Sequence, residues 1–338
     1  MYPRTGTDHP IIGILCSFLL LVVYCSTKAP IAAMTTSSSD TSVTRLPPPS
    51  DANMEATYNG LAQRAIDLYR SKKGSGVGGR CWIGIAGGPG AGKSTLAAAV
   101  ADKICEQAAS VESTTNENTS LIRAVAIPMD GYHYTRKELA QVSKNLGFDG
   151  DGTKGMSRRG APWTFDALGL ARDLKRAKEL GKASLPEYDR KLSDPVDNIV
   201  VIEESHQIIL VEGNYLILGR LLAEVNDSNL GTPGSPLETA SFDLECPVAI
   251  GREIERWRDV NELWDETWFV APPKNAVKVQ RDRIVERSLE TWNPSKTAAW
   301  GGDTDRKAAE NRADFNDVRN AKLVECCRSY ADAIIDSI

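Results

Sequence analysis

A lysine and two hydroxyl side chains follow a run of glycines near residue 90. The stretch reads Gly-Gly-Pro-Gly-Ala-Gly-Lys-Ser-Thr. Glycines allow a tight turn whose successive backbone N–H groups converge on one point, so such a loop can hold phosphate groups. Lys93 is expected to reach the outer phosphates of a nucleoside triphosphate, and Ser94 to ligate magnesium. The predicted nucleotide-binding residues of this P-loop are Gly87, Gly88, Pro89, Gly90, Ala91, Gly92, Lys93, Ser94 and Thr95.

The residues around this loop have the periodicity that a P-loop requires. An apolar run at 81–86 precedes it, and a helical pattern that begins Leu-Ala-Ala-Ala-Val follows it. A chance glycine-rich turn would not need a strand before it and a helix after it. The sequence therefore predicts chemistry on a nucleoside triphosphate and leaves the phosphoryl acceptor as the harder question.

Two carboxylates follow other predicted strands. Asp130 lies just beyond the strand at 121–127, at the carboxyl end where ligands collect in open parallel sheets. It is a candidate base for a substrate hydroxyl, a magnesium partner in the second coordination shell, or a turn-forming Asp-Gly, and the residues alone leave these open. Glu212 ends the apolar run that begins at Gln207, which is typical of a Walker B strand whose acid faces the magnesium.

Arginines occur in two patterns that suit phosphoryl transfer. Arg283 and Arg287 lie four residues apart in a predicted helix at 279–289, so both could reach the transferring group from a lid. A solvated basic stripe is the alternative. Arg158 and Arg159 stand beside Trp163 and could grip an anionic or polyol acceptor, or merely decorate a loop.

Composition narrows the partners. The chain has 338 residues and a net charge of −5, with acidic and basic residues interspersed. No polybasic face suggests nucleic acid or an anionic membrane, so a small-molecule ligand fits better. The seven cysteines show no CxxC spacing and no even framework, which argues against structural zinc and a disulfide scaffold.

The first 50 residues differ from the rest. An apolar run at 11–25 is shorter than the about 20 residues of a spanning helix. It could be a targeting segment, an anchor, or an extension upstream of a start at Met34. The Ser/Thr/Pro-rich stretch at 35–49 is expected to be a disordered linker. We expect a kinase domain at 51–338 without stable membrane association. A cytoplasmic location is expected because a kinase would find little ATP outside the cell, with organelle targeting or membrane anchoring by the apolar segment as the alternatives.

The remaining patterns predict a three-layer α/β domain with a mostly parallel sheet, a small lid and acceptor-binding insertions. Further predicted strands are 198–202, 265–270 and 331–338, the last closing the sheet, and a long helix is predicted at 308–328. The polar stretch 106–120 is predicted to be a surface loop, and 218–256 an insertion at the sheet's edge.

Together the motifs resemble a known family. The order GGPGAGKST, PMDGYHY, RRGAPWTFD, EYDRKLSDPV, IILVEGNYLIL, RIVER and NDVRNAKLV is similar to the P-loop kinases of the uridine kinase, phosphoribulokinase and bacterial pantothenate kinase group. Within that group the chain resembles the fungal and bacterial ATP-dependent kinases that are nucleoside- or fructose-kinase-like. The resemblance runs from about Ala56 to the C-terminus.

The resemblance implies ATP as phosphoryl donor, Mg²⁺ as cofactor and Asp130 as catalytic base. It also implies Lys93 on the phosphates, Ser94 and Glu212 at the metal, and Arg283 and Arg287 on the lid. The acceptor contacts that it implies are Tyr132, Arg159, Asp166 and Tyr188.

The sequence thus predicts transfer of the γ-phosphoryl group of ATP to a hydroxyl of a nucleoside, sugar or pantothenate-like metabolite. A GTPase switch or metallochaperone is one alternative, although no Asn-Lys-x-Asp motif follows the strands. A non-catalytic nucleotide-binding protein is another, disfavoured by the retention of Lys93, Ser94, Asp130 and Glu212. The acceptor's identity and the oligomeric state are not determined by the sequence.

Overall fold

The computed structural model describes residues 44–45, 54–74, 79–115, 121–147, 153–224, 247–272 and 276–337. The chain divides into two units, 1–41 and 42–338, and all the described residues belong to the second. The apolar run at 11–25 therefore lies outside the described residues, and the proposed boundary near residue 50 stays a prediction. None of the helices in the described ranges is both long and apolar enough to cross a membrane.

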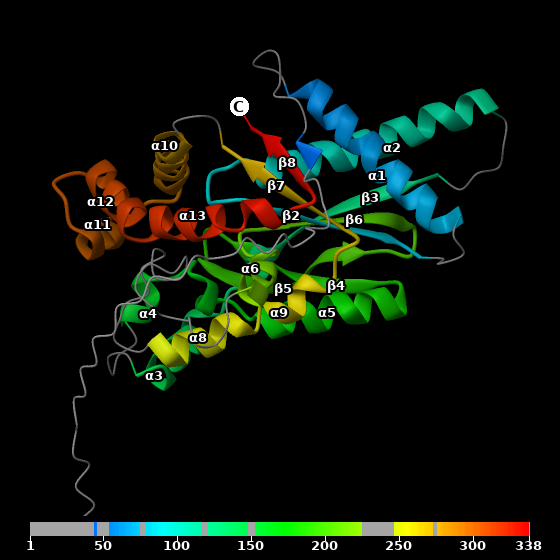
Figure 1. The fold of residues 1–338 in the computed structure, drawn as a ribbon. Coiled ribbons are helices and arrows are strands. Elements are labelled where there is room, and N and C mark those ends of the chain that lie inside the picture. The colour runs from blue at the N-terminus through cyan, green and yellow to red at the C-terminus, as the bar shows by residue number, and fades with distance from the viewer. Residues whose placement is uncertain are drawn as a thin grey trace, which may run out of the picture. The chain divides into compact units, whose positions relative to one another are not determined.

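A parallel sheet of six strands lies at the centre of the second unit (Figure 1). In spatial order the strands are β1 (Thr44–Arg45), β8 (Ala333–Asp336), β7 (Glu266–Ala271), β2 (Cys81–Ala86), β6 (His206–Gly213) and β3 (Arg123–Pro128). All neighbouring pairs run parallel. Since β2 is buried along its whole length, it reads as a continuous apolar run, as strands covered on both faces do. The predicted strand at 331–338 corresponds to β8, which lies between β7 and β1.

Helices cover both faces of this sheet and make three layers. Alternate side chains of one strand point to opposite faces. Ile83 of β2 packs in the core under α1 (Glu55–Gly74) and α2 (Lys93–Thr115). Its neighbour Trp82 belongs to the other core, with Leu170 and Leu174 of α5 (Ala167–Leu180). The predicted α/β class and its mostly parallel sheet are confirmed.

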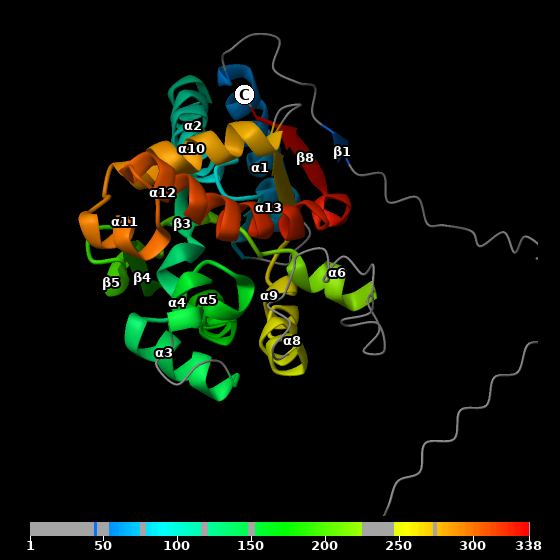
Figure 2. The ribbon, with the colours of Figure 1, turned by 90° about the vertical axis from the view of Figure 1, so that its left-hand side faces the viewer.

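The remaining helices are short. They are α3 (Arg136–Asn145), α4 (Thr153–Ser157), α6 (Leu218–Glu224), α8 (Pro247–Glu255), α9 (Arg258–Asn261), α10 (Ala276–Leu289), α11 (Pro294–Trp300), α12 (Asp305–Arg312) and α13 (Val318–Glu325). Figure 1 shows α10, α11 and α12 grouped at one end of the sheet, and Figure 2 turns that end toward the viewer. Helices α10 and α12 share a small apolar cluster with the turn that follows α12, formed by Ile284, Val285, Ala309 and Ala313.

A separate hairpin completes the second unit. Strands β4 (Ala183–Asp189) and β5 (Asp194–Ile202) pair antiparallel with each other. The carboxylate of Asp189 accepts hydrogen bonds from the backbone N–H groups of Lys191 and Leu192, which fixes the turn that carries Arg190. The sequence predicted a strand at 198–202 but not its partner.

Two predicted elements differ from the observed ones. The surface loop predicted from residue 106 is wrong up to Thr115, because α2 continues to that residue. Ile104 and Ala108 extend its buried stripe, so the polar residues between them only mark the exposed face.

The second difference is in the helix predicted at 308–328, which is interrupted. A π-helical turn at Ala313–Asp317 separates α12 from α13. The described ends of the predicted insertion, α6 and α8, contribute Leu221 and Ile254 to the core. Residues 225–246 of that segment lie outside the described residues, so the insertion stays a prediction.

Candidate active site

The glycine-rich loop has the backbone shape that its sequence predicts. It connects the end of β2 to the start of α2, so that the helix N-terminus faces whatever the loop holds. Gly90 and Gly92 have φ angles of 76° and 92°, in the left-handed region that favours glycine. A Cβ atom on Gly90 would lie 2.8 Å from the backbone oxygen of Gln280, so α10 packs directly on the loop.

Lys93 is held at the mouth of this loop. Its side chain is buried, and its Nζ donates hydrogen bonds to Asn214 Oδ1 at 2.9 Å and to the carbonyl of Gly88 at 3.2 Å. Burial lowers the pKa of Lys93, while the negative charges of Glu212 and Asp130 act to raise it. The ammonium group is thus oriented by neutral oxygen acceptors that a phosphate could replace.

Ser94 and Glu212 form the pair expected at a magnesium site. Ser94 Oγ donates to Glu212 Oε1 at 2.7 Å. Glu212 pairs in register with Ile85 of β2 and Pro128 of β3, so the sheet brings its carboxylate to the foot of the loop. Burial raises the pKa of Glu212, and Lys93 and Ser94 oppose that shift.

This donor set fits Mg²⁺, a hard cation that takes oxygen ligands. Magnesium bound with a nucleotide usually uses one or two protein oxygens and completes its shell with phosphate oxygens and water. The hydroxyl of Ser94 and the carboxylate of Glu212 could supply those two. In the described ranges no group of three or more His, Cys, Asp or Glu side chains is arranged to hold a metal by itself.

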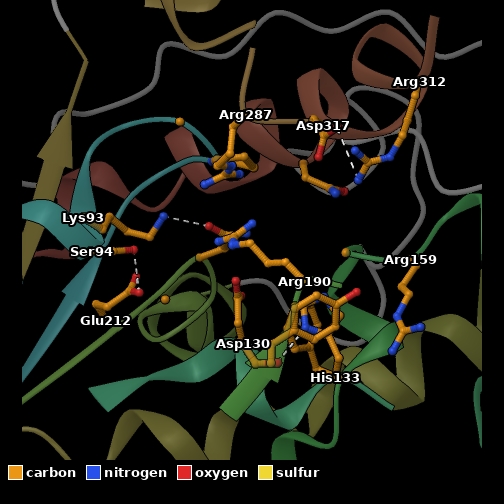
Figure 3. A pocket seen from close by; sticks show the side chains of 18 residues that line it. Lys93, Ser94, Asp130, His133, Arg159, Arg190, Glu212, Arg287, Arg312 and Asp317 are labelled. Atoms are coloured by element: carbon orange, nitrogen blue, oxygen red, sulfur yellow. Dashed lines mark hydrogen bonds and ion pairs between the residues drawn. The ribbon is translucent and has the colours of Figure 1, made fainter. Parts of the chain in front are cut away.

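Asp130 lies in a short 3₁₀ turn (Met129–Tyr132) directly after β3. It lines the same cavity as Lys93, Ser94 and Glu212, and Figure 3 shows its carboxylate directed into that cavity. His133 lies beneath it, with Nδ1 2.8 Å from the backbone oxygen of Asp130, so this nitrogen must carry the proton. The ring of His133 also packs between Phe165 and Tyr188, at centroid distances of 3.9 and 4.8 Å.

The two predicted lid arginines both face the loop, from α10. Arg283 donates to the carbonyl of Gly90 at 3.3 Å and lines the cavity on the outer side of the P-loop. Arg287 lines that cavity and also the one that holds Asp130 (Figure 3). Loss of solvent lowers the pKa of Arg287, and the neighbouring Arg190 lowers it further.

Only two of the four predicted acceptor contacts lie in this cavity. Arg159 and Tyr188 line it, with the guanidinium of Arg159 5.5 Å from the ring centroid of Tyr188. Tyr132 instead is buried against α5, where its hydroxyl donates to Asp173 at 3.3 Å. Asp166 caps α5 by accepting the backbone N–H of Gly169 at 2.9 Å. Both have structural partners, and neither lines the cavity around Asp130.

Comparison with known proteins identifies the chain as a P-loop kinase. No protein-family model matches the chain. A protein from Schizosaccharomyces pombe named "Putative uridine kinase" is 35% identical over 173 residues, which are 50% of this chain and 63% of that protein. The match thus spans less than two thirds of that relative. The "ATP-dependent kinase-like protein notR'" of Aspergillus versicolor is 30% identical over 176 residues, 51% of this chain and 77% of that protein. The chain belongs to the same family of P-loop kinases as this ATP-dependent kinase-like protein.

A solved structure has the same fold. The crystal structure of a "putative fructose transport system kinase" from Silicibacter sp. TM1040 superimposes with a TM-score of 0.54 and 23% sequence identity. The alignment covers 82% of this chain and 98% of that one. At this level of identity the likeness concerns the fold of the kinase alone.

Several residues of the kinase cavity were not predicted from the sequence. They are Asn214, Arg190, Arg312, Asp317 and Asn320. Arg190 makes no hydrogen bond or ion pair through its guanidinium with any described residue, although it borders the cavities on both sides of Asp130. Two of these residues could have been found from the sequence. Asp317 and Asn320 are polar residues at positions of the helical pattern that are buried, and buried polar residues are uncommon.

The paired arginines have different roles in the structure. Arg158 is buried and donates to Asn316 Oδ1 at 2.6 Å, so it serves the packing of the π-helical turn. Arg159 alone reaches the cavity, and its Nη2 pairs with Asp194 at 2.7 Å.

Proposed function

We propose that this kinase transfers the γ-phosphoryl group of ATP to a hydroxyl group of a small molecule. The observation that carries the proposal is the meeting of Lys93, the Ser94–Glu212 pair and Asp130 in one cavity at the carboxyl ends of β2, β3 and β6 (Figure 3). A nucleotide-binding protein needs the first two features. A carboxylate that faces the space beyond the outermost phosphate is the further feature that transfer to a hydroxyl needs, because it can accept the hydroxyl proton.

In this proposal each side chain has one task. The P-loop amides and Lys93 bind the phosphates, and Ser94 and Glu212 would hold Mg²⁺. Bound Mg²⁺ would neutralise charge on the phosphate oxygens. Asp130 accepts the proton of the acceptor hydroxyl while the hydroxyl oxygen bonds to the γ-phosphorus and the bond to the β-phosphate oxygen breaks, which releases ADP.

In this proposal Arg287 and Arg190 stabilise the transition state. Both guanidinium groups lie in the cavity between the loop and Asp130, and neither is paired with a described acid. A guanidinium presents several N–H donors in a rigid plane, which suits the oxygens of a transferring phosphoryl group. Closure of α10 over the loop would exclude water and so limit ATP hydrolysis.

A screen of ADP release tests this proposal. Purified protein is mixed with Mg·ATP and, in turn, nucleosides, sugars, sugar phosphates, hydroxy acids and pantothenate. At least one class should raise ADP release well above the rate with ATP alone, and the product should contain the γ-phosphate. ATP binding without acceptor-dependent release across the whole panel would favour the non-catalytic alternative.

A further inference from the structure

Six positive side chains converge on a second cavity, next to the one that holds Asp130. They are Arg136, Arg159, Arg190, Arg287, Lys296 and Arg312, and Asp317 is the one carboxylate among the described residues that line this cavity. They come from α3, α10, α11, α12, the β4–β5 turn and the segment after α4. A solvated stripe would follow one helix, so this arrangement is a product of the tertiary fold.

The like charges are close enough to affect one another. Burial lowers the pKa of Lys296, and Arg312 and Arg136 lower it further. The pKa of Arg287 is lowered by burial and by Arg190. Repulsion of this kind destabilises the cluster until an anion binds there.

ATP does not account for the whole cluster. The P-loop residues that line the first cavity, which are Pro89, Gly90, Lys93 and Ser94, are not among the residues of the second. Arg136 and Lys296 line only the second. Figure 3 shows Lys93 and Ser94 on one side of Asp130, and Arg159 and Arg312 on the other. We call Arg136, Arg159, Lys296 and Arg312 the outer cations. They lie beyond Asp130 as seen from the P-loop, on the side where the proposed acceptor would bind.

Two buried polar atoms in the wall lack hydrogen-bond partners among the described residues. Asp317 Oδ2 and Arg159 Nε have no hydrogen bond to any described residue. The side chain of Arg159 is 10% exposed, and Asp317 is 9% exposed, with its carboxylate 3.9 Å from an Arg312 nitrogen. Buried polar groups are normally hydrogen-bonded, so these two point to a ligand. The carboxylate oxygen can accept a hydroxyl, and the Nε–H can donate to an anion.

We propose that the acceptor is a small hydroxylated anion. Its phosphate or carboxylate group binds the outer cations, one hydroxyl is bound by Asp317, and the hydroxyl to be phosphorylated faces Asp130. This proposal rests on the proposed kinase function and narrows its substrate class.

Matched acceptor pairs test the charge directly. We would measure kcat/KM for D-glycerate against glycerol, ribose 5-phosphate against ribose, and pantothenate against pantothenol, with uridine as a neutral nucleoside. In at least one pair the anion should exceed its neutral partner by about 10²-fold or more, because a site that pairs a ligand group discriminates against its absence. The pair with the largest ratio of kcat/KM values shows whether the site binds a carboxylate or a phosphate group. Preference for uridine or for the neutral members would overturn the proposal and leave the kinase function standing.

Two single variants test the site itself. Arg136 is exposed, and its side chain has no described partner. Arg136→Gln and Lys296→Gln should each raise KM for the anionic acceptor by about tenfold or more, as expected for loss of a hydrogen bond to a charged group, with KM for ATP unchanged. Lys137→Gln, at the next position of the same helix, also exposed and outside the cavity, is the matched control. Equal effects at Arg136 and Lys137 would contradict the site.

A binding measurement separates this proposal from the kinase function. Calorimetric titration of D-glycerate or ribose 5-phosphate into protein saturated with a non-hydrolysable Mg·ATP analogue keeps the P-loop occupied. Binding that weakens in Arg136→Gln but not in Lys137→Gln would support the anion site even if no acceptor were phosphorylated. If neither D-glycerate nor ribose 5-phosphate bound, the anion site would be overturned.

Discussion

At the residue scale, Asp130 carries the distinction between a transferase and a nucleotide-binding protein. It lines the cavity with Lys93 and Glu212, yet the P-loop hydroxyl of Ser94 bonds to Glu212 and not to Asp130. Ser94 thus contacts one of the two acids, Glu212, and leaves the carboxylate of Asp130 directed into the cavity. This division supports the base among the alternatives that the residues alone left open.

Asp130→Asn should keep ATP affinity and lose turnover. An amide cannot accept the hydroxyl proton, and general-base help is worth about 10² to 10⁴ in rate. Steady-state kcat and a nucleotide titration would measure the two effects. A parallel loss of Mg·ATP affinity, with transfer surviving in proportion, would instead make Asp130 a magnesium partner.

Arg287→Ala should lower kcat by orders of magnitude with little change in melting temperature. Arginine fingers contribute about 10³ to 10⁵ in rate, whereas exposed ion pairs contribute about 0 to 1 kcal/mol to stability. Arg287→Lys should restore only part of the lost kcat, because an ammonium group lacks the planar arrangement of N–H donors of a guanidinium.

The control for Arg287 is Arg306→Ala, an exposed residue of α12 paired with Glu286 outside the cavity. Arg281 is a poorer control, because it pairs with Asp314 of the π-helical turn at 2.5 Å. Similar small losses at Arg287 and Arg306 would show that α10 carries only a solvated stripe.

At the scale of elements, the P-loop is in direct contact with α10, the helix that carries the two predicted lid arginines. Gly90 leaves no room for a Cβ against Gln280, and Gly87 approaches the backbone of β7 at Val270. The loop is thus clamped between a strand and a lid helix. Movement of α10 would be transmitted to the phosphates.

Gly90→Ala should weaken Mg·ATP binding and lower the melting temperature. The new Cβ would lie 2.8 Å from a backbone oxygen, at a residue whose φ of 76° is strained for alanine. Calorimetry for nucleotide binding and a thermal melt would check both effects.

Gly60→Ala in α1 is the matched control, since nothing lies within 4 Å of its Cβ position. Alanine in an exposed helix interior should raise the free energy of unfolding by about 0.5 to 1 kcal/mol. Unchanged nucleotide affinity in Gly90→Ala would contradict the clamped loop.

At the scale of the whole molecule, two histidines make stability depend on pH. Burial lowers the pKa of both His133 and His206 below the ordinary 6.5. Acid groups facing His133 include Asp130, while Arg159 and Arg190 disfavour its charge. The unfolded chain therefore binds more protons than the folded one as the pH falls below about 6.5.

The free energy of unfolding should accordingly fall as pH is lowered through about 6.5 toward the folded-state pKa values. Urea unfolding without nucleotide at several values between pH 7.5 and 5.5 would measure the slope. His133→Gln should reduce that slope, and His206→Gln should reduce it separately while leaving turnover unchanged. A slope identical in both variants and the natural chain would contradict the assignment.

The sequence by itself determined the P-loop, the strand–loop–helix order around it and the two acids that end later strands. Local rules suffice there, because the left-handed glycines at 90 and 92 and the apolar runs of β2 and β6 are encoded within a few residues. The α/β class followed from the same periodicity.

Only the tertiary structure decided which side chains share a cavity. Arg159 and Tyr188 reach it while Tyr132 and Asp166 do not, because α5 provides the latter with a hydrogen-bonding carboxylate and a capping position. Arg190 enters because a hairpin pairs β4 with β5, and Asp317 because a π-helical turn interrupts a helix that the pattern predicted to be continuous. The cavity brings together residues as far apart in the chain as Pro89 and Asn320, and spacing along the chain carries no information about such contacts.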